Sequence, residues 1–132
     1  DEVILVTTPE PTAITDAYAL AKMVSNRDRE KRIGLLVNKA RDIKEAENVA
    51  NKFSDVSEKF LSLKLLKLGY ILYDDTVTKS VKMQTPFSLY NPRCVAARNV
   101  SEIADKLFSD PVPAKNSGAK GFISKLLSFF GV

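Results

Sequence analysis

The chain has 132 residues, of which 45% are hydrophobic and 27% are charged, a composition typical of one globular domain. It contains one cysteine and no histidine, which excludes an internal disulfide, a Cys/His metal site and histidine-based catalysis. The formal net charge is +4, and residues 114–132 supply three lysines and no acidic residue. The other residues hold 17 basic and 16 acidic groups, so we expect no nucleic-acid-binding face.

Three short apolar runs in the first half of the chain predict strands. They lie at residues 3–6, 33–37 and 69–73, and each is uniformly apolar rather than alternating. This pattern is typical of strands that are covered on both faces of a parallel sheet.

Helical periodicity separates the three runs. The first helix is expected over about 13–26, with Thr12 as its cap, and the second over about 43–66, loosened near 55–57. The apolar stripe of the second helix consists of Val49, Phe53, Val56, Phe60 and Leu63. This alternation of three strands and two helices predicts an α/β layered sandwich with a mostly parallel sheet and right-handed crossovers.

The chain after the third run predicts a short helix from about Thr76, an extended segment over 86–92 and a last helix over about 94–108. Three parallel strands leave an exposed hydrophobic edge, and the chain opens within a strand, so we expect an upstream part of the domain to be missing. The opening DEVILV does not resemble a secretory leader, which favours a cytoplasmic location. Residues 1–110 are therefore expected to be part of one domain.

The last twelve residues, GFISKLLSFFGV, predict an amphipathic helix over 121–132. It follows a segment over 111–120 whose composition is typical of a flexible linker. The helix is too short to span a bilayer, so it is a core helix, a partner-binding helix or a helix that lies on a membrane surface. Its lysines favour an anionic membrane surface, while docking on its own domain remains the alternative. The expected membrane-binding residues are Lys120, Phe122, Ile123, Lys125, Leu126, Leu127, Phe129 and Phe130.

Polar side chains follow the second and third strands. Asn38 and Lys39 come at the carboxyl end of the second strand, where ligands bind in open α/β sheets. An Asn amide can read the edge of a nucleobase and a Lys stem can cover its face, although Asn is also a common turn residue. Tyr73 and Asp74 reach the same edge after the third strand, and Asp75 is expected to cap the following helix.

The first strand is followed by TTPEPTAITD, in which Thr8, Glu10 and Asp16 either face a ligand or partner or serve as caps. The chain contains no G-x-x-x-x-G-K-[ST] motif, and none of its glycines predicts a phosphate-binding loop. We therefore expect no catalytic machinery within this chain and no ATP hydrolysis by it alone.

Four segments together resemble the carboxy-terminal half of MinD/ParA-type ATPases, and in particular the FlhG branch, also called FleN or YlxH, which controls flagellar number. The segments are VTTPEPTAITDAYALAK, IGLLVNKA, LGYILYDDTVTKSVKMQTPFSLYNP and GFISKLLSFFGV. The TTPEPTAITDAY block and the Q-x-PF-x-x-x-x-P block are the most specific. The chain departs from the family at Leu72, where Pro is usual, and at Cys94, where Ser is commoner.

The resemblance implies part of a P-loop NTPase fold of the SIMIBI class that binds ATP as a sandwich dimer, with Mg2+ held by the missing amino-terminal half. By similarity, Asn38, Lys39, Tyr73 and Asp74 form the adenine side of the site. The segment from Thr8 to Asp16 contributes to the dimer face, and the tail is a reversible membrane anchor on the inner face of the cell membrane.

The resemblance also implies protein partners of the complete protein. They are its amino-terminal half, a second copy when ATP is bound, and either a flagellar GTPase of the FlhF type or proteins of the flagellar switch or division site. A rival hypothesis is a standalone membrane-associated adaptor that binds a protein without nucleotide turnover. The adaptor hypothesis predicts a stable monomer, whereas half of an ATPase, with a bare sheet edge, would be poorly soluble or would pair a strand with another chain.

Overall fold

The computed structural model describes residues 2–109. The strands in this part of the chain are β1 (Glu2–Thr7), β2 (Arg32–Ala40) and β3 (Leu66–Leu72). The helices are α1 (Pro11–Arg27), α2 (Ile43–Leu61), α3 (Asp75–Lys82), α4 (Phe87–Tyr90) and α5 (Val95–Ser109).

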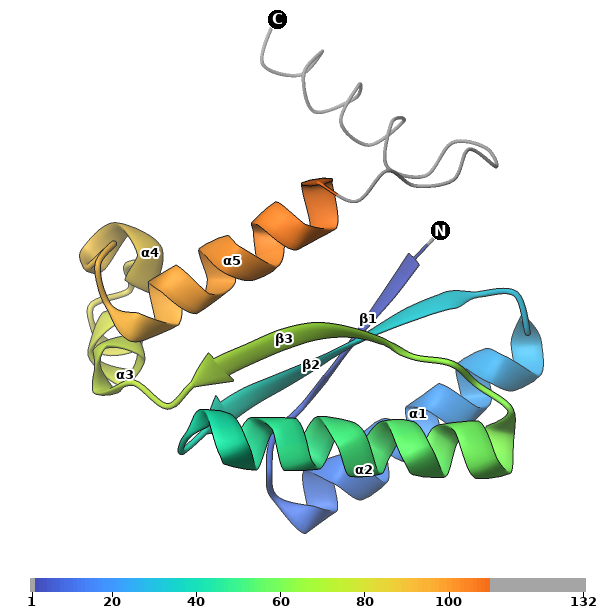
Figure 1. The fold of residues 1–132 in the computed structure, drawn as a ribbon. Coiled ribbons are helices and arrows are strands. Elements are labelled where there is room, and N and C mark those ends of the chain that lie inside the picture. The colour runs from blue at the N-terminus through green and yellow to red at the C-terminus, as the bar shows by residue number, and fades with distance from the viewer. Residues whose placement is uncertain (1, 110–132) are drawn as a thin grey trace, which may run out of the picture.

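The strands form a parallel sheet in the order β1-β2-β3 (Figure 1). α1 and α2 lie together on one face of the sheet, and α5 lies on the other face against β3. α3 and α4 form a short hairpin beside the carboxyl end of β3. This arrangement confirms the predicted α/β layered sandwich with a parallel sheet.

The main core lies between the sheet and the pair α1 and α2. Its buried residues are Leu5, Ala17, Ala21, Ile33, Leu35, Phe53 and Leu63. The rings of Tyr18 and Phe53 meet edge to face with their centroids 6.4 Å apart, which joins α1 to α2. A smaller cluster of Val37, Ala40 and Ala46 fixes the start of α2 below the carboxyl end of β2.

The predicted coverage of the strands on both faces is wrong for β1 within the described residues. Ile4 and Val6 alternate with buried Leu5 and Thr7, and about half of each side chain is exposed. No described helix lies over this face of β1, because α5 packs on β3 at the other edge of the sheet.

The structure corrects the boundaries of α1 and α2. α1 begins at Pro11 with Glu10 at the N-cap position, so Thr12 lies inside the first turn and does not cap the helix. α2 is continuous through 55–57 and ends at Leu61, because Ser62 adopts a left-handed conformation with a φ of 52°.

The structure also corrects the segment before the last helix. The segment over 86–92 is not fully extended, since Pro86 precedes the single turn of α4. A helix tolerates proline at its start because the first N–H groups have no partner within the helix. The last helix begins at Val95, within one residue of the expected start.

Candidate functional site

The carboxyl ends of β2 and β3 bring the expected ligand-facing residues together. Asn38 pairs with Ile71 and Ala40 with Leu72 in the sheet register, and the Tyr73 N–H donates to the Ala40 carbonyl oxygen at 2.8 Å. Tyr73 therefore continues the β2–β3 pairing by one residue beyond β3. Asn38 and Lys39 on β2 and Tyr73 and Asp74 after β3 thus border the same edge of the sheet, where open α/β sheets bind ligands.

Lys39 has an unusual backbone conformation at this edge. Its φ is 58°, and the β2–β3 register shifts between Asn38 and Ala40, which places a β-bulge at Lys39. The Asn38 Oδ1 accepts a hydrogen bond from the Lys39 N–H at 2.9 Å, which supports the bulge locally. β-Bulges are common next to functional sites, where they change the direction of a side chain. A non-glycine residue in the left-handed conformation is also energetically unfavourable, and such residues cluster at functional sites.

Asp74, rather than Asp75, caps α3. The Asp74 carboxylate accepts from the Thr76 N–H at 2.8 Å and from the Ala96 N–H at 3.2 Å, so it joins the start of α3 to the start of α5. The pKa of Asp74 is lowered, mainly by its hydrogen bonds with Thr76, because these bonds favour the charged carboxylate. The expectation that Asp75 caps this helix is wrong.

Asp75 instead interacts with Tyr73. The Tyr73 hydroxyl donates to the Asp75 carboxylate at 2.9 Å, and this hydrogen bond raises the pKa of Tyr73 because the neutral phenol is the donor. Tyr73 is well exposed, so its ring is accessible at the edge of the sheet. The carboxylates of Asp74 and Asp75 serve different partners and do not form a pair for metal binding or acid–base chemistry.

Asn99 is a residue of this region that the sequence did not reveal. It is buried on α5, and its Oδ1 accepts from the Leu72 N–H at 3.1 Å. Together with the contact between Asp74 and the Ala96 N–H, this bond holds the end of β3 and the residues after it against α5. In the sequence, only the i, i+3 spacing of Ala96 and Asn99 could have indicated that Asn99 lies on the buried face of the last helix.

Thr8, Glu10 and Asp16 lie at the end of β1 and on the start of α1. The Thr8 Oγ1 accepts from the Glu10 N–H at 3.4 Å, while both carboxylates are exposed. Within the described residues, no hydrogen bond joins these three side chains to Asn38, Lys39, Tyr73 or Asp74. They border an accessible surface and do not serve as side-chain caps of α1.

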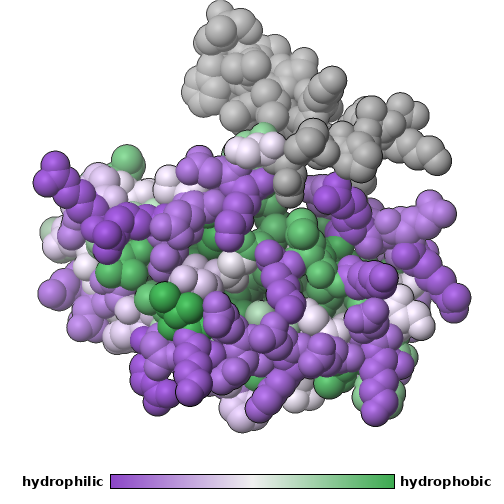
Figure 2. Space-filling view, viewed as in Figure 1, coloured by the Kyte–Doolittle hydropathy of each residue, from purple (hydrophilic) through white to green (hydrophobic). Residues whose placement is uncertain are grey.

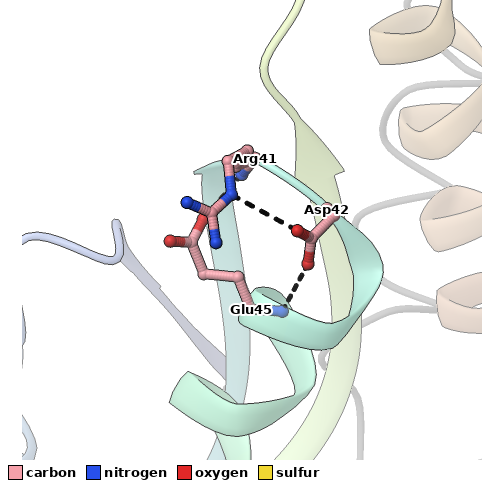
Figure 3. Close-up of polar contacts among 3 residues, drawn as sticks. All are labelled: Arg41, Asp42 and Glu45. Carbon is pink, nitrogen blue, oxygen red and sulfur yellow. Dashed lines mark hydrogen bonds and ion pairs between the residues drawn. The ribbon is translucent and has the colours of Figure 1, made fainter.

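A groove with a volume of about 740 Å³ lies between the first half of α1 and the part of α2 up to Val56. Its floor includes Ile14, Tyr18, Phe53 and Val56. At its rim, Asp42 accepts from the Glu45 N–H at 2.8 Å (Figure 3). The Glu45 carboxylate accepts from the Arg41 N–H at 2.7 Å.

This reciprocal arrangement fixes the start of α2. The hydrogen bond from the Glu45 N–H lowers the pKa of Asp42. The Arg41 Nε and the Asp42 carboxylate also form an ion pair at 3.3 Å (Figure 3). The side chains at this rim therefore have a structural explanation.

No cluster of acidic, histidine or cysteine residues able to hold a metal ion occurs among residues 2–109. No helix in the same range is long and apolar enough to cross a membrane. The linker over 111–120 and the predicted helix over 121–132, with all of its membrane-binding candidates, lie outside the described residues.

The parallel sheet and the helices on its two faces form an α/β fold with polar residues at the carboxyl edge of the sheet. The MinD cell division protein of Aquifex aeolicus has this fold with a TM-score of 0.60 at 18% identity, over 88% of this chain and 47% of that one. No protein-family model matches the chain.

The chain is related in sequence to MinD/FlhG-type proteins, as the resemblance predicts. It is 36% identical over 126 residues to the antiactivator FleN of Pseudomonas aeruginosa, which covers 96% of this chain and 45% of FleN. It is 29% identical over 136 residues to the flagellum site-determining protein YlxH of Helicobacter pylori, over 99% of this chain and 46% of YlxH. The septum site-determining protein MinD of Bacillus subtilis is also 29% identical, over 100% of this chain and 48% of that protein. The chain spans about half the length of the curated relatives it matches.

Proposed function

We propose that this chain is the carboxy-terminal part of a MinD/FlhG-like ATPase that regulates flagellar number or placement, or placement of the division site. Support comes from the names of its relatives and from the α/β fold. The observation on which the nucleotide role depends is the hydrogen bond from the Tyr73 N–H to the Ala40 carbonyl oxygen, which unites the ends of β2 and β3.

In this proposal the edge of β2 and β3 supplies the adenine side of an ATP site. Asn38 fits this role because its Oδ1 is engaged with the Lys39 N–H, while no described hydrogen bond uses its amide N–H groups. An adenine ring offers acceptors to such donors. Lys39 and Tyr73 are exposed and fit as cover for the face of a base.

Asp74 takes a positioning role in the same site, because its carboxylate is already bonded to two backbone N–H groups. ATP, when bound, supplies the phosphates on which hydrolysis occurs. Their ligands and the Mg2+ site belong to the preceding half of the protein, since this chain has no P-loop.

The dimer face and the membrane anchor complete the proposal. Thr8, Glu10 and Asp16 border an accessible surface next to the sheet edge, which suits contact with a second ATP-bound copy. The tail over 121–132 anchors the protein reversibly to an anionic membrane surface. One such helix binds weakly, so dimerisation strengthens binding by presenting two copies.

The nucleotide role is tested by titrating ATP into isotopically labelled chain and recording backbone amide shifts. Shifts concentrated at Asn38, Lys39 and Tyr73 support the role, and Asn38→Ala should remove them. Asn48→Ala is the matched control, because Asn48 is an exposed residue of α2 away from this edge. Shifts that are unchanged by Asn38→Ala would contradict the assignment.

The anchor is tested by co-sedimentation with anionic and neutral vesicles. Phe122→Asp with Leu126→Asp should strongly weaken binding to the anionic vesicles if the tail is the anchor. The runner-up function is a membrane-associated adaptor without nucleotide. It predicts vesicle binding with no amide shifts on addition of ATP, which distinguishes it from the ATPase proposal.

A further inference from the structure

The hairpin of α3 and α4 ends in an exposed apolar surface, which we call the tip. Leu89 is 73% exposed, Val81 69% and Met83 64%, and Tyr90 is also exposed. Single exposed apolar residues are ordinary in soluble proteins. Four within ten residues of one short hairpin are a local concentration of the kind that marks interaction sites.

The tip is held by a defined backbone structure. Gln84, two residues after the end of α3, adopts a left-handed conformation, and the Thr85 N–H donates to the Ser80 carbonyl oxygen at 3.1 Å. Pro86 then starts α4, and its carbonyl oxygen accepts from the Leu89 N–H at 2.9 Å. The apolar side chains are thus presented by hydrogen-bonded turns.

The hairpin does not need the tip residues for its own core. Val77 and Phe87 occupy its inner side, where they pack against a cluster of Cys94, Ala96 and Ala97. Ser80 is fully buried and donates to the Val77 carbonyl oxygen at 2.8 Å. Because the inner positions are filled, the tip residues are available to contact another surface.

The chain segment that contains the tip carries only positive charge. Between Asp75 and Glu102 the sequence contains four basic residues and no acidic one. The basic residues are Lys79, Lys82, Arg93 and Arg98, and all four are exposed. None forms an ion pair within residues 2–109, and the nearest carboxylate in the sequence, that of Asp75, accepts the Tyr73 hydroxyl.

We propose that the α3–α4 tip inserts into the headgroup region of an anionic lipid surface, as a membrane contact separate from the tail. Figure 2 shows small apolar areas between many hydrophilic side chains at the left end of the molecule, where α3 and α4 lie. Apolar residues with lysine and arginine at their border suit a surface of anionic headgroups above acyl chains. A nucleic acid would use the cations alone and leave Val81, Met83 and Leu89 unpartnered.

A single tryptophan at the tip tests insertion directly, since the chain contains no tryptophan. In Leu89→Trp, with the tail intact, we expect the emission to shift to the blue on anionic vesicles and to stay unchanged on neutral ones. Met23→Trp is the matched control, because Met23 is 62% exposed on α1. Vesicle binding without a blue shift in Leu89→Trp would refute insertion of the tip and leave the tail as the anchor.

Partitioning measures the contribution of the tip. Met83→Gln with Leu89→Gln should weaken binding to anionic vesicles about tenfold, the effect of incompletely burying two apolar side chains. The control pair Leu20→Gln with Met23→Gln should leave binding unchanged. Adding Phe122→Asp and Leu126→Asp to each protein separates the tail from the tip. Loss of duplex DNA binding in the tip variant, with vesicle binding unchanged, would overturn the proposal.

Discussion

Replacing Asp74 by alanine should destabilise the chain more than any other change at the sheet edge. The variant loses the N-cap of α3, which costs about 0.5–2 kcal/mol. It also leaves the Ala96 N–H without its acceptor, and Ala96 is fully buried. An unsatisfied buried donor costs about 1–3 kcal/mol, so the expected total is about 1.5–5 kcal/mol in the free energy of unfolding.

Urea unfolding followed by far-ultraviolet circular dichroism measures this difference. Asp75→Ala is the matched control, because it removes a neighbouring carboxylate whose described hydrogen bond is to the exposed Tyr73 hydroxyl. Its expected effect is within about 0.5 kcal/mol. Asp74→Ser separates the two contributions, since serine can still cap α3 but is too short to reach the Ala96 N–H as well.

The reasoning would be refuted if Asp75→Ala destabilised the chain as much as Asp74→Ala. Equal stability of Asp74→Ser and the parent chain would show that the bond to the Ala96 N–H contributes nothing. In that case α5 would be held on the sheet by its apolar contacts and by Asn99 alone.

Three further predictions follow from the same structure. The pKa of Asp74 is lowered in the folded state, so its stabilising effect is present above the unfolded pKa of about 3.9 and is lost as the pH falls through the folded value; Asp74→Asn should flatten this decline in unfolding scans below about pH 4. Phe53→Ala should cost about 3–5 kcal/mol in urea unfolding, because Phe53 is 3% exposed in the core, whereas Phe60→Ala should change stability by less than about 0.5 kcal/mol because Phe60 is 66% exposed. Lys39→Gly should stabilise the chain by about 0.5–1 kcal/mol in the same assay, since glycine relieves the left-handed backbone at a smaller entropic cost, and a loss of stability would show that the Lys39 side chain contributes packing.

Periodicity predicted the elements better than their ends. The apolar runs located all three described strands, and the helical patterns located α1, α2, α3 and α5. The end of α2 was missed by five residues because the left-handed conformation of Ser62, a residue with no strong preference for it, ends the helix. α4 was missed because one turn after Pro86 is too short to produce a period.

The face that a side chain occupies was predicted less well. The stripe of α2 was expected to be inward, yet Phe53 is buried while Phe60 is well exposed. A 100° period identifies one side of a helix but not which positions along that side are covered in the fold.

The sequence by itself determined the α/β order of elements, the polar residues at the strand ends and the resemblance to MinD/FlhG-type proteins, because these depend on local pattern. Only the tertiary structure decided which carboxylate caps α3, that Asn99 holds the end of β3, and that Lys39 sits in a bulge. These features join residues that are up to 27 positions apart in the chain. Long-range hydrogen bonds depend on how the strands pair and where α5 packs, and no local pattern in the sequence encodes that geometry.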